Sequence, residues 1–283
     1  MMLPEFKAVR DPMVEYLKKL GWAFVEPDKC IELRGSNNGL FLLRILREKI
    51  KALNEIAIRT DEQVDEVIEK LKTVEANVRG NQGFLHYLCG EKTIVMEKEN
   101  RELNVKLIDF GNAESNSFHV TKDFEFSDKR TVRADIALLI NGIPVLLVET
   151  KSPSIQNAME EAFAQVRRYH EEIPKLMKVV QVFILSDGIQ LEFGPTWNLD
   201  HKSIHKWKIP QEINLESLAK DFFTKNKILR LLRNYIFFFN KGEELQKFVL
   251  DQNQMKAVEK MARRLCSLQE REDVDVLQTA PSN

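Results

Sequence analysis

Three charged residues stand at the ends of two apolar stretches of the sequence: Asp135, Glu149 and Lys151. A carboxylate at the edge of a buried segment is costly unless it is paired or holds a metal ion. Two carboxylates that face each other repel, and a divalent cation that prefers oxygen ligands, such as Mg²⁺, relieves that repulsion. Two interpretations of these three residues are open: a structural ion pair, and a metal centre of the kind that activates a bound water for hydrolysis.

The segments over 132–140 and 144–151 must position these side chains. We predict both as strands, and each carries apolar residues on its two faces, which is typical of central strands of a sheet. Asn141-Gly142 between them is a strong signal for a hairpin turn. The two segments are therefore expected to pair directly with each other.

The register of this hairpin decides whether the two carboxylates meet. A strict two-residue turn places Asp135 opposite Val148, with its side chain pointing away from Glu149. One extra residue, in a longer loop or in a bulge, places Asp135 opposite Glu149 instead. The metal-site hypothesis therefore predicts an odd-length loop or a bulge in this hairpin.

Gln165 and Tyr169 form a second pair of polar residues, on a helix predicted over 155–172 with Ser154 as its cap. Their i,i+4 spacing puts both side chains on one face of that helix. Two interpretations are open. The pair belongs either to an ordinary half-buried amphipathic face or to a set of groups that supports the strand carrying Glu149.

The wider pattern of elements predicts an α/β fold with a core of about six strands. The first 90 residues or so are expected to be mostly helical, with Asp11 capping the first helix. Helices are predicted over 11–20, 40–53, 60–71, 84–88, 155–172, 225–239 and 254–265. Strands are predicted over 105–110, 117–126, 132–140, 144–151, 179–185 and 189–193, with one more over 202–208.

Composition excludes several classes of protein. The chain has 42 Lys and Arg against 43 Asp and Glu, so its net charge of −1 argues against a broadly basic coat for nucleic acid, although not against a local basic groove. No apolar run approaches the roughly 18 residues of a membrane helix. Three widely spaced cysteines fit a reducing compartment. We expect a cytoplasmic protein with no membrane partner.

Two motifs together resemble a nuclease signature. Asp135 followed by Glu149-Thr150-Lys151 resembles the PD-(D/E)xK pattern, with Ala134 where that family often has proline. Gln165 and Tyr169 look like the Gln-x-x-x-Tyr motif of RecB-like nucleases. A longer stretch, residues 105–110, 117–120, 133–153 and 186–188, resembles the N-terminal nuclease domain of the motor (R) subunit of type I restriction enzymes.

The end of the chain extends the resemblance to the same family. Residues 251–258 resemble the glutamine-bearing lead-in to its helicase motor, and 276–283 look like the strand that enters a Walker A loop. No Gly-Lys-Ser/Thr follows, so we expect a fragment without a complete ATP site. Gln254 would then be an ATP-related residue only in the full-length protein, where ATP is the second cofactor.

The resemblance implies a restriction-endonuclease-like mixed β-sheet flanked by helices, with helical N-terminal and C-terminal segments. Within it, 1–95 would be a mainly helical part of the nuclease domain, 96–210 the PD-(D/E)xK core, and 211–283 a helical linker and the start of a truncated motor. The partners implied are double-stranded DNA and the methyltransferase and specificity subunits of a restriction-modification complex.

The resemblance also implies roles for single residues in magnesium-dependent cleavage of DNA. Asp135, Glu149 and the backbone carbonyl of Thr150 would hold one or two Mg²⁺ ions, and Lys151 would assist the attacking water. Glu15 on the first helix is a candidate third acidic ligand, although a surface helix often carries such a residue. Second-tier candidates for positioning or for contact with the DNA backbone are Gln165, Tyr169, Arg133 and Arg168.

Two other interpretations stay open. The chain would be a catalytically silent scaffold that docks a motor to its partner subunits, or a stand-alone RecB-like nuclease. Intact acidic and lysine residues favour the enzyme over the scaffold, and the helicase-like lead-in argues against the stand-alone nuclease.

Overall fold

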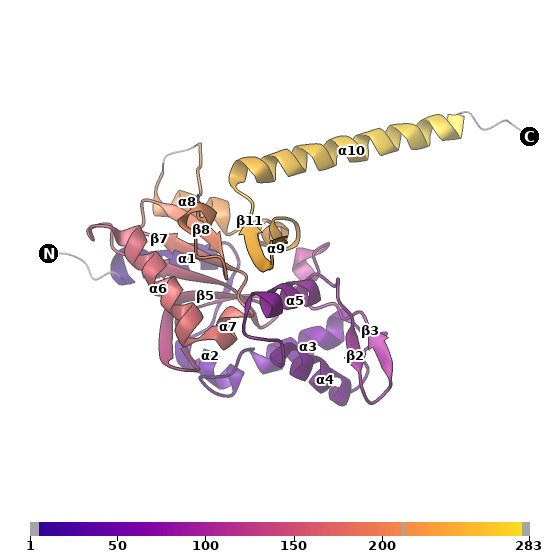
Figure 1. Cartoon of the computed structure of the whole chain (residues 1–283), viewed down its shortest axis with the longest axis horizontal. Coiled ribbons are helices and arrows are strands. Elements are labelled where there is room, and N and C mark those ends of the chain that lie inside the picture. Colours follow the sequence, from indigo (N-terminus) through magenta and orange to yellow (C-terminus); the bar gives the residue numbers. More distant parts are fainter. Residues whose placement is uncertain (1–5, 211–212, 279–283) are drawn as a thin grey trace, which may run out of the picture. The chain divides into compact units, whose positions relative to one another are not determined.

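The computed structural model describes residues 6–210 and 213–278, and the side chains of all of these except 6–7 and 266–278. The chain divides into two compact units, Met1–Val249 and Leu250–Asn283. The first unit contains the sheet and most of the helices (Figure 1). Among the described residues, no helix has both the length and the apolar character needed to cross a membrane.

A seven-stranded mixed sheet forms the core of the first unit, in the order β1-β4-β5-β6-β7-β8-β9. The pairs β1–β4 and β6–β7 are parallel, and the other neighbouring strands are antiparallel. The strands are β1 (Ala23–Phe24), β4 (Phe118–Ser127), β5 (Thr131–Ile140), β6 (Ile143–Thr150), β7 (Val182–Ser186), β8 (Leu191–Pro195) and β9 (His205–Lys206). The predicted α/β class with a helix-flanked mixed sheet is confirmed.

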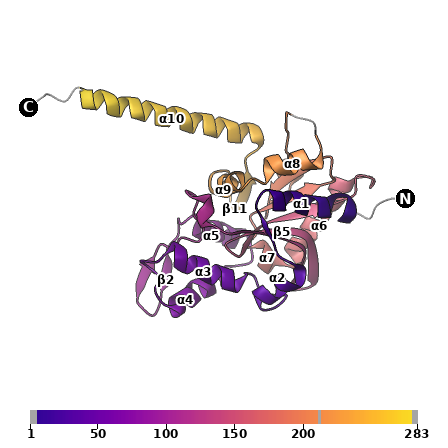
Figure 2. The same cartoon turned by 180° about the vertical axis from the view of Figure 1, so that it is seen from behind.

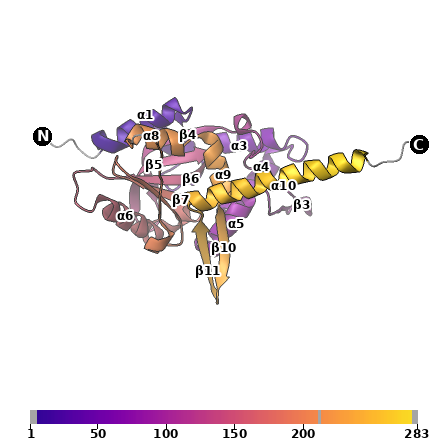
Figure 3. The same cartoon turned by 90° about the horizontal axis from the view of Figure 1, so that it is seen from above.

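Helices cover both faces of this sheet. Figure 3 shows α1 and α8 on one side and α6 on the other, and in Figure 2, the view of Figure 1 from behind, α1 lies in front of α6. The helices of the first unit are η1 (Phe6–Arg10), α1 (Asp11–Lys19), α2 (Pro27–Arg34), α3 (Leu43–Leu53), α4 (Asp61–Lys72), α5 (Val78–Leu88), η2 (Ala113–Ser115), α6 (Ala158–Glu172), α7 (Pro174–Met177), η3 (His201–Ser203), α8 (Leu215–Phe222) and α9 (Lys225–Asn234).

Two small hairpins complete the first unit: β2 (Ile94–Met96) with β3 (Arg101–Leu103), and β10 (Ile236–Lys241) with β11 (Glu244–Val249). The second hairpin corrects the helix predicted over 225–239, because α9 ends at Asn234. The aromatic residues that follow have a high β propensity and a short apolar run does not distinguish helix from strand.

The strand predicted over 105–110 is also wrong, although Val105, Leu107 and Ile108 are buried as a strand would bury them. Side-chain amides form hydrogen bonds here with backbone groups that would otherwise pair with a neighbouring strand. Asn54 bonds both the amide (2.8 Å) and the carbonyl (2.9 Å) of Lys106, and Asn141 donates to the carbonyl of Leu107 at 2.8 Å. The backbone is therefore satisfied without pairing to a strand.

Helix starts were predicted less accurately than helix positions. Asp11 is the first residue of α1 rather than its cap, because the turn η1 precedes it. Helix α6 begins after Asn157, which adopts a left-handed backbone, and not after Ser154. The helix predicted over 60–71 matches α4, which starts with a capping box in which Thr60 and Gln63 exchange side-chain and backbone hydrogen bonds. Helix α2 was not predicted.

A fully buried lysine, Lys247 on β11, joins the β10–β11 hairpin to the rest of the first unit. Its Nζ lies 2.6 Å from Asn81 Oδ1, 2.7 Å from the carbonyl oxygen of Gln181 and 2.9 Å from the Oε1 of the same residue. The Thr196 hydroxyl lies 3.1 Å away. Burial among neutral groups lowers the pKa of this lysine well below its ordinary value.

The second unit consists mainly of α10 (Gln252–Gln278). Asp251 accepts hydrogen bonds from the amides of Asn253 (2.7 Å) and Gln254 (2.9 Å), and Gln254 Oε1 accepts one from the Asp251 amide at 2.9 Å. Asp251 and Gln254 therefore form a capping box at the start of this helix. The strand expected over 276–283 is wrong for 276–278, which end α10, and its remainder lies outside the described residues.

Candidate active site

A β-bulge sets the register of the β5–β6 hairpin. Ile140 pairs with Ile143 across a two-residue turn, whereas farther along the hairpin Ile136 pairs with Val148, so one extra residue, Val145, lies in β6. Continuing this register places Asp135 opposite Glu149. The predicted bulge is confirmed, and it allows a tight turn and a facing pair of carboxylates in the same hairpin.

Positive φ angles at both turn residues, 53° at Asn141 and 83° at Gly142, explain why the tight turn persists. A side chain on Gly142 would also approach the carbonyl oxygen of Leu42 to 2.8 Å, so the turn residue doubles as a packing contact. The hairpin that carries the carboxylates is thus fixed at its closed end by α3 and the residues before it.

The Asp135 carboxylate is held by the strand beside it. Its Oδ2 accepts hydrogen bonds from the Thr150 amide at 2.7 Å and from the Thr150 hydroxyl at 2.8 Å. The side chain is half-buried, and the bonds to a fully buried residue restrict its orientation. The role expected for the carbonyl oxygen of Thr150 stays a prediction.

Glu149 is fully buried on the same face of the sheet. Its Oε1 accepts a hydrogen bond from the Tyr169 hydroxyl at 2.7 Å and a longer one from the Asp135 amide at 3.4 Å. Its Oε2 is buried with no hydrogen-bond partner. Burial, and then the nearby charge of Asp135, raises the pKa of Glu149 well above its ordinary value. A buried acceptor without a donor is the environment that a cation would satisfy.

Helix α6 supplies the groups that connect Glu149 to the lysine. Gln165 Nε2 donates to the Tyr169 hydroxyl at 2.7 Å, and Gln165 Oε1 accepts from Lys151 Nζ at 3.1 Å. One glutamine amide therefore links the tyrosine that holds Glu149 to the candidate catalytic lysine. The interpretation of Gln165 and Tyr169 as site-supporting groups is favoured over an ordinary amphipathic face.

Glu15 does not join these groups. It is exposed on α1 and pairs with Lys18 at 2.9 Å. Within the described residues, no group of three or more His, Cys, Asp or Glu side chains could hold a metal ion. The two facing carboxylates suit an ion such as Mg²⁺, which usually keeps several of its waters, and they do not form a closed protein cage.

The two arginines among the second-tier candidates are both exposed. Arg133 is on β5, two residues before Asp135, and is 68% exposed. Arg168 is exposed on α6, between Gln165 and Tyr169 in sequence. Asp123 on β4, whose Oδ1 lies 3.4 Å from the Arg133 Nε, was not among the site residues predicted from the sequence. Its signal was weak, a single acidic residue inside a strand pattern.

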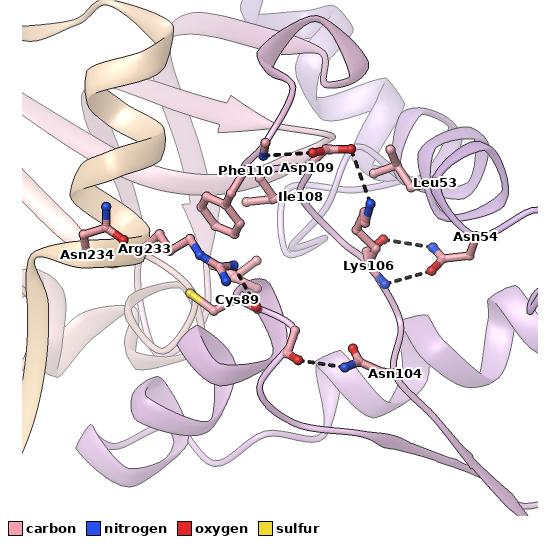
Figure 4. A pocket seen from close by; sticks show the side chains of 13 residues that line it. Leu53, Asn54, Cys89, Asn104, Lys106, Ile108, Asp109, Phe110, Arg233 and Asn234 are labelled. Carbon is pink, nitrogen blue, oxygen red and sulfur yellow. Dashed lines mark hydrogen bonds and ion pairs between the residues drawn. The ribbon is translucent and has the colours of Figure 1, made fainter. Parts of the chain in front are cut away.

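A cavity of about 750 Å³ lies elsewhere in the first unit, and none of its lining residues belongs to the carboxylate pair (Figure 4). Its polar groups are used in packing. Arg233 donates to the carbonyl of Cys89 at 3.2 Å and stacks on Phe110, and Lys106 pairs with Asp109 at 3.4 Å. Burial raises the pKa of the Cys89 thiol to about 12, so no reactive thiolate lies here at neutral pH.

The sequence of this chain is similar to a known protein family and to several named proteins. Residues 2–202 match the family described as the N terminus of the type I restriction enzyme R protein. The chain is 31% identical over 251 residues to a putative type I restriction enzyme endonuclease subunit, MjaVIIIP, of Methanocaldococcus jannaschii, covering 84% of this chain and 23% of that protein.

Two bacterial relatives bear related names. The EcoprrI endonuclease subunit of Escherichia coli is 27% identical over 224 residues, which is 71% of this chain and 67% of that protein. The HindI endonuclease subunit of Haemophilus influenzae is 26% identical over 255 residues, which is 80% of this chain and 23% of that protein. The chain thus spans less than a quarter of the length of two of these three relatives.

Proposed function

Because the chain belongs to the family of type I restriction enzyme R proteins, we propose that it is a nuclease module that hydrolyses phosphodiester bonds of double-stranded DNA with the help of Mg²⁺. The observation that carries this proposal is the buried Glu149 oxygen without a partner, opposite the Asp135 carboxylate in an enforced register. Structural ion pairs bury both charges together, whereas here two acids are brought face to face.

Each residue of the site has a definite task in this proposal. Asp135 and Glu149, with the carbonyl oxygen of Thr150, would bind one or two ions. Bound Mg²⁺ lowers the pKa of a coordinated water and stabilises the leaving oxygen. Lys151, whose Nζ donates to Gln165 Oε1 at 3.1 Å, would orient the attacking water and neutralise charge that develops on the phosphate.

Tyr169→Phe is expected to lower the rate of DNA cleavage roughly 10- to 100-fold without unfolding the chain, as losses of groups that orient metal ligands generally do. The hydroxyl is the shortest bond to Glu149 Oε1 and it also receives the Gln165 amide. Tyr87→Phe is the matched control, a buried tyrosine on α5 outside the site. A Tyr169→Phe enzyme with unchanged cleavage rate and unchanged Mn²⁺ affinity would contradict the assigned role.

We extend the proposal to the whole enzyme only by analogy with the named relatives. There, the chain would act in a cytoplasmic complex with methyltransferase and specificity subunits, and cleavage would accompany ATP-driven translocation by the full-length protein. Residues 1–95 and 96–210 would form the nuclease domain, and 211–283 would lead into the motor. Gln254, which bonds to the Asp251 amide at the start of α10 here, would acquire its ATP-related role in that larger context.

A crystal soaked in Mn²⁺ tests the proposal directly. We expect an anomalous peak between Asp135 and Glu149 in the wild type. Glu15→Gln is the control, because the exposed Glu15 pairs with Lys18 and should not affect the ion. A wild-type crystal without an ion at the carboxylate pair would favour the alternative, a catalytically silent scaffold that docks the motor to its partner subunits.

A further inference from the structure

Asp123, in the middle of β4, has a left-handed backbone with φ of 49°. Lys122 pairs with Ile136 and Phe124 pairs with Ala134, so Asp123 lies opposite Asp135 on the neighbouring strand. A non-glycine residue in this conformation is strained and persists only where its surroundings fix it. Aspartate is among the residues that tolerate it best. The surroundings of Asp123 should therefore reveal what holds it.

Two arginines from different elements meet the Asp123 carboxylate. Arg10 Nη1, at the end of η1, lies 2.7 Å from Oδ1, and Arg133 Nε, on β5, lies 3.4 Å from the same oxygen. The Arg10 side chain is 12% exposed and that of Arg133 is 68% exposed. Asp123 thus bridges a nearly buried guanidinium to one that reaches into solvent.

This pairing makes Asp123 a poor metal ligand and Arg133 a good phosphate ligand. Two guanidinium groups already neutralise the Asp123 carboxylate, so it attracts a metal cation only weakly. Arg133 is engaged through Nε, and a guanidinium bound in this way still carries donors on both terminal nitrogens. Arg133 and Asp135 are two residues apart on one strand, so their side chains leave the same face about 7 Å apart.

We propose that Asp123 is a positioning residue that fixes Arg133 as a clamp for a DNA phosphate beside the metal-binding carboxylates. Arg10 holds Asp123 from the interior side. The inference rests on the proposed nuclease function and adds to it a residue that orients the substrate. The clamp reads the backbone and not the bases, so it suits a module without sequence preference of its own.

The substitution Asp123→Asn distinguishes a positioning role of Asp123 from a general electrostatic effect on DNA binding, because the two predict opposite changes in affinity. Asp123→Asn removes a negative charge and keeps a residue that accepts the left-handed backbone. If only net charge mattered, this variant would bind DNA more tightly. If Asp123 orients Arg133, it should bind about fivefold more weakly, because a fixed arginine–phosphate contact is lost. Glu172→Gln is the matched control, since Glu172 pairs with the exposed Arg130 at 3.5 Å.

The experiment measures the binding of a fluorescent DNA duplex by the whole chain over a range of salt concentrations, with Ca²⁺ in place of Mg²⁺. We expect Arg133→Ala to weaken binding about tenfold and to lower the salt slope by about one ion. We expect the double variant Asp123→Asn with Arg133→Ala to bind no more weakly than Arg133→Ala alone.

Three of the results that would overturn the clamp come from variants of Asp123 and Glu172. The first is that Asp123→Asn binds DNA as tightly as the wild type. The second is that the double variant loses DNA affinity by the sum of the two single losses. The third is that Glu172→Gln loses as much DNA affinity as Asp123→Asn. No difference between the wild type and Arg133→Ala, including no binding by either, also overturns it. Calorimetry with Mn²⁺ on the same samples keeps the two proposals apart. Binding of Mn²⁺ that needs Asp135 and Glu149 leaves the nuclease proposal standing even if the clamp fails.

Discussion

Replacing Asp135 or Lys151 with alanine is expected to lower the rate of DNA cleavage by the assembled enzyme roughly a thousandfold or more, while leaving the fold intact. Asp135 offers the half-buried carboxylate of the metal site, and Lys151 is tied to the site through Gln165. The measurement is conversion of supercoiled plasmid to its cut forms, together with thermal unfolding of each variant.

Alanine substitutions that remove one acidic or one basic side chain far from the site provide the control for this experiment. Glu216 and Lys220 form an exposed ion pair on α8 at 2.6 Å, and α8 lies on the other side of the sheet from α6. Alanine at either position removes the same type of charge and should leave cleavage unchanged. Undiminished cleavage by Asp135→Ala or Lys151→Ala would refute the assigned site.

Glu149→Gln should produce the second large effect, the loss of divalent metal binding by at least about a hundredfold in affinity. The buried side chain keeps its shape and its bond from Tyr169, but it loses the charge that a cation needs. Isothermal calorimetry with Mn²⁺ measures this loss. Glu192→Gln is the control, because Glu192 on β8 also has a pKa raised mainly by burial but lies outside the carboxylate pair.

The same substitution should change how stability depends on pH. Burial raises the pKa of Glu149 in the folded chain, while the unfolded chain titrates near the ordinary value of about 4.3. Above that value the unfolded state binds fewer protons than the folded state. The free energy of unfolding of the metal-free wild type therefore falls as pH rises from there toward the raised pKa. Glutamine cannot titrate, so Glu149→Gln should lack this fall.

Denaturant titrations in EDTA across that pH range provide the measurement. The metal-free variant is expected to be more stable than the metal-free wild type at neutral pH, because it has no buried charge to create. Added Mn²⁺ should stabilise the wild type and not the variant. A wild type whose stability does not fall with pH would show that Glu149 is not held protonated by its surroundings.

The hairpin that carries the site was predictable because its signals are local and strong. Apolar residues on both faces and an Asn-Gly turn predicted the hairpin, and a facing pair of acids within it required an odd-length loop or a bulge. The structure has a bulge, at Val145. The sequence could not say which residue would bulge. That choice depends on how β6 packs against both of its neighbours and on the contact of Gly142 with the residues before α3.

Other elements were missed because long-range contacts determine them. The stretch over 105–110 has the composition of a strand, but two asparagines distant in sequence satisfy its backbone. The β10–β11 hairpin depends on Lys247, whose partners come from α5, from the residue before β7 and from the residue after β8. Asp123 looks like an ordinary polar strand residue until the structure brings Arg10 beside it.

Lys247 has a mechanical consequence. The covalent chain passes into the second unit directly after Val249, two residues beyond this lysine. Tension applied to the chain from that side reaches β11 before it reaches the central sheet. To yield, the strand must pull a fully buried amine away from four close polar contacts. Resistance to pulling is set by the rate of unfolding and not by equilibrium stability. We therefore expect these four contacts of Lys247 to resist the removal of β11 when force arrives along the chain.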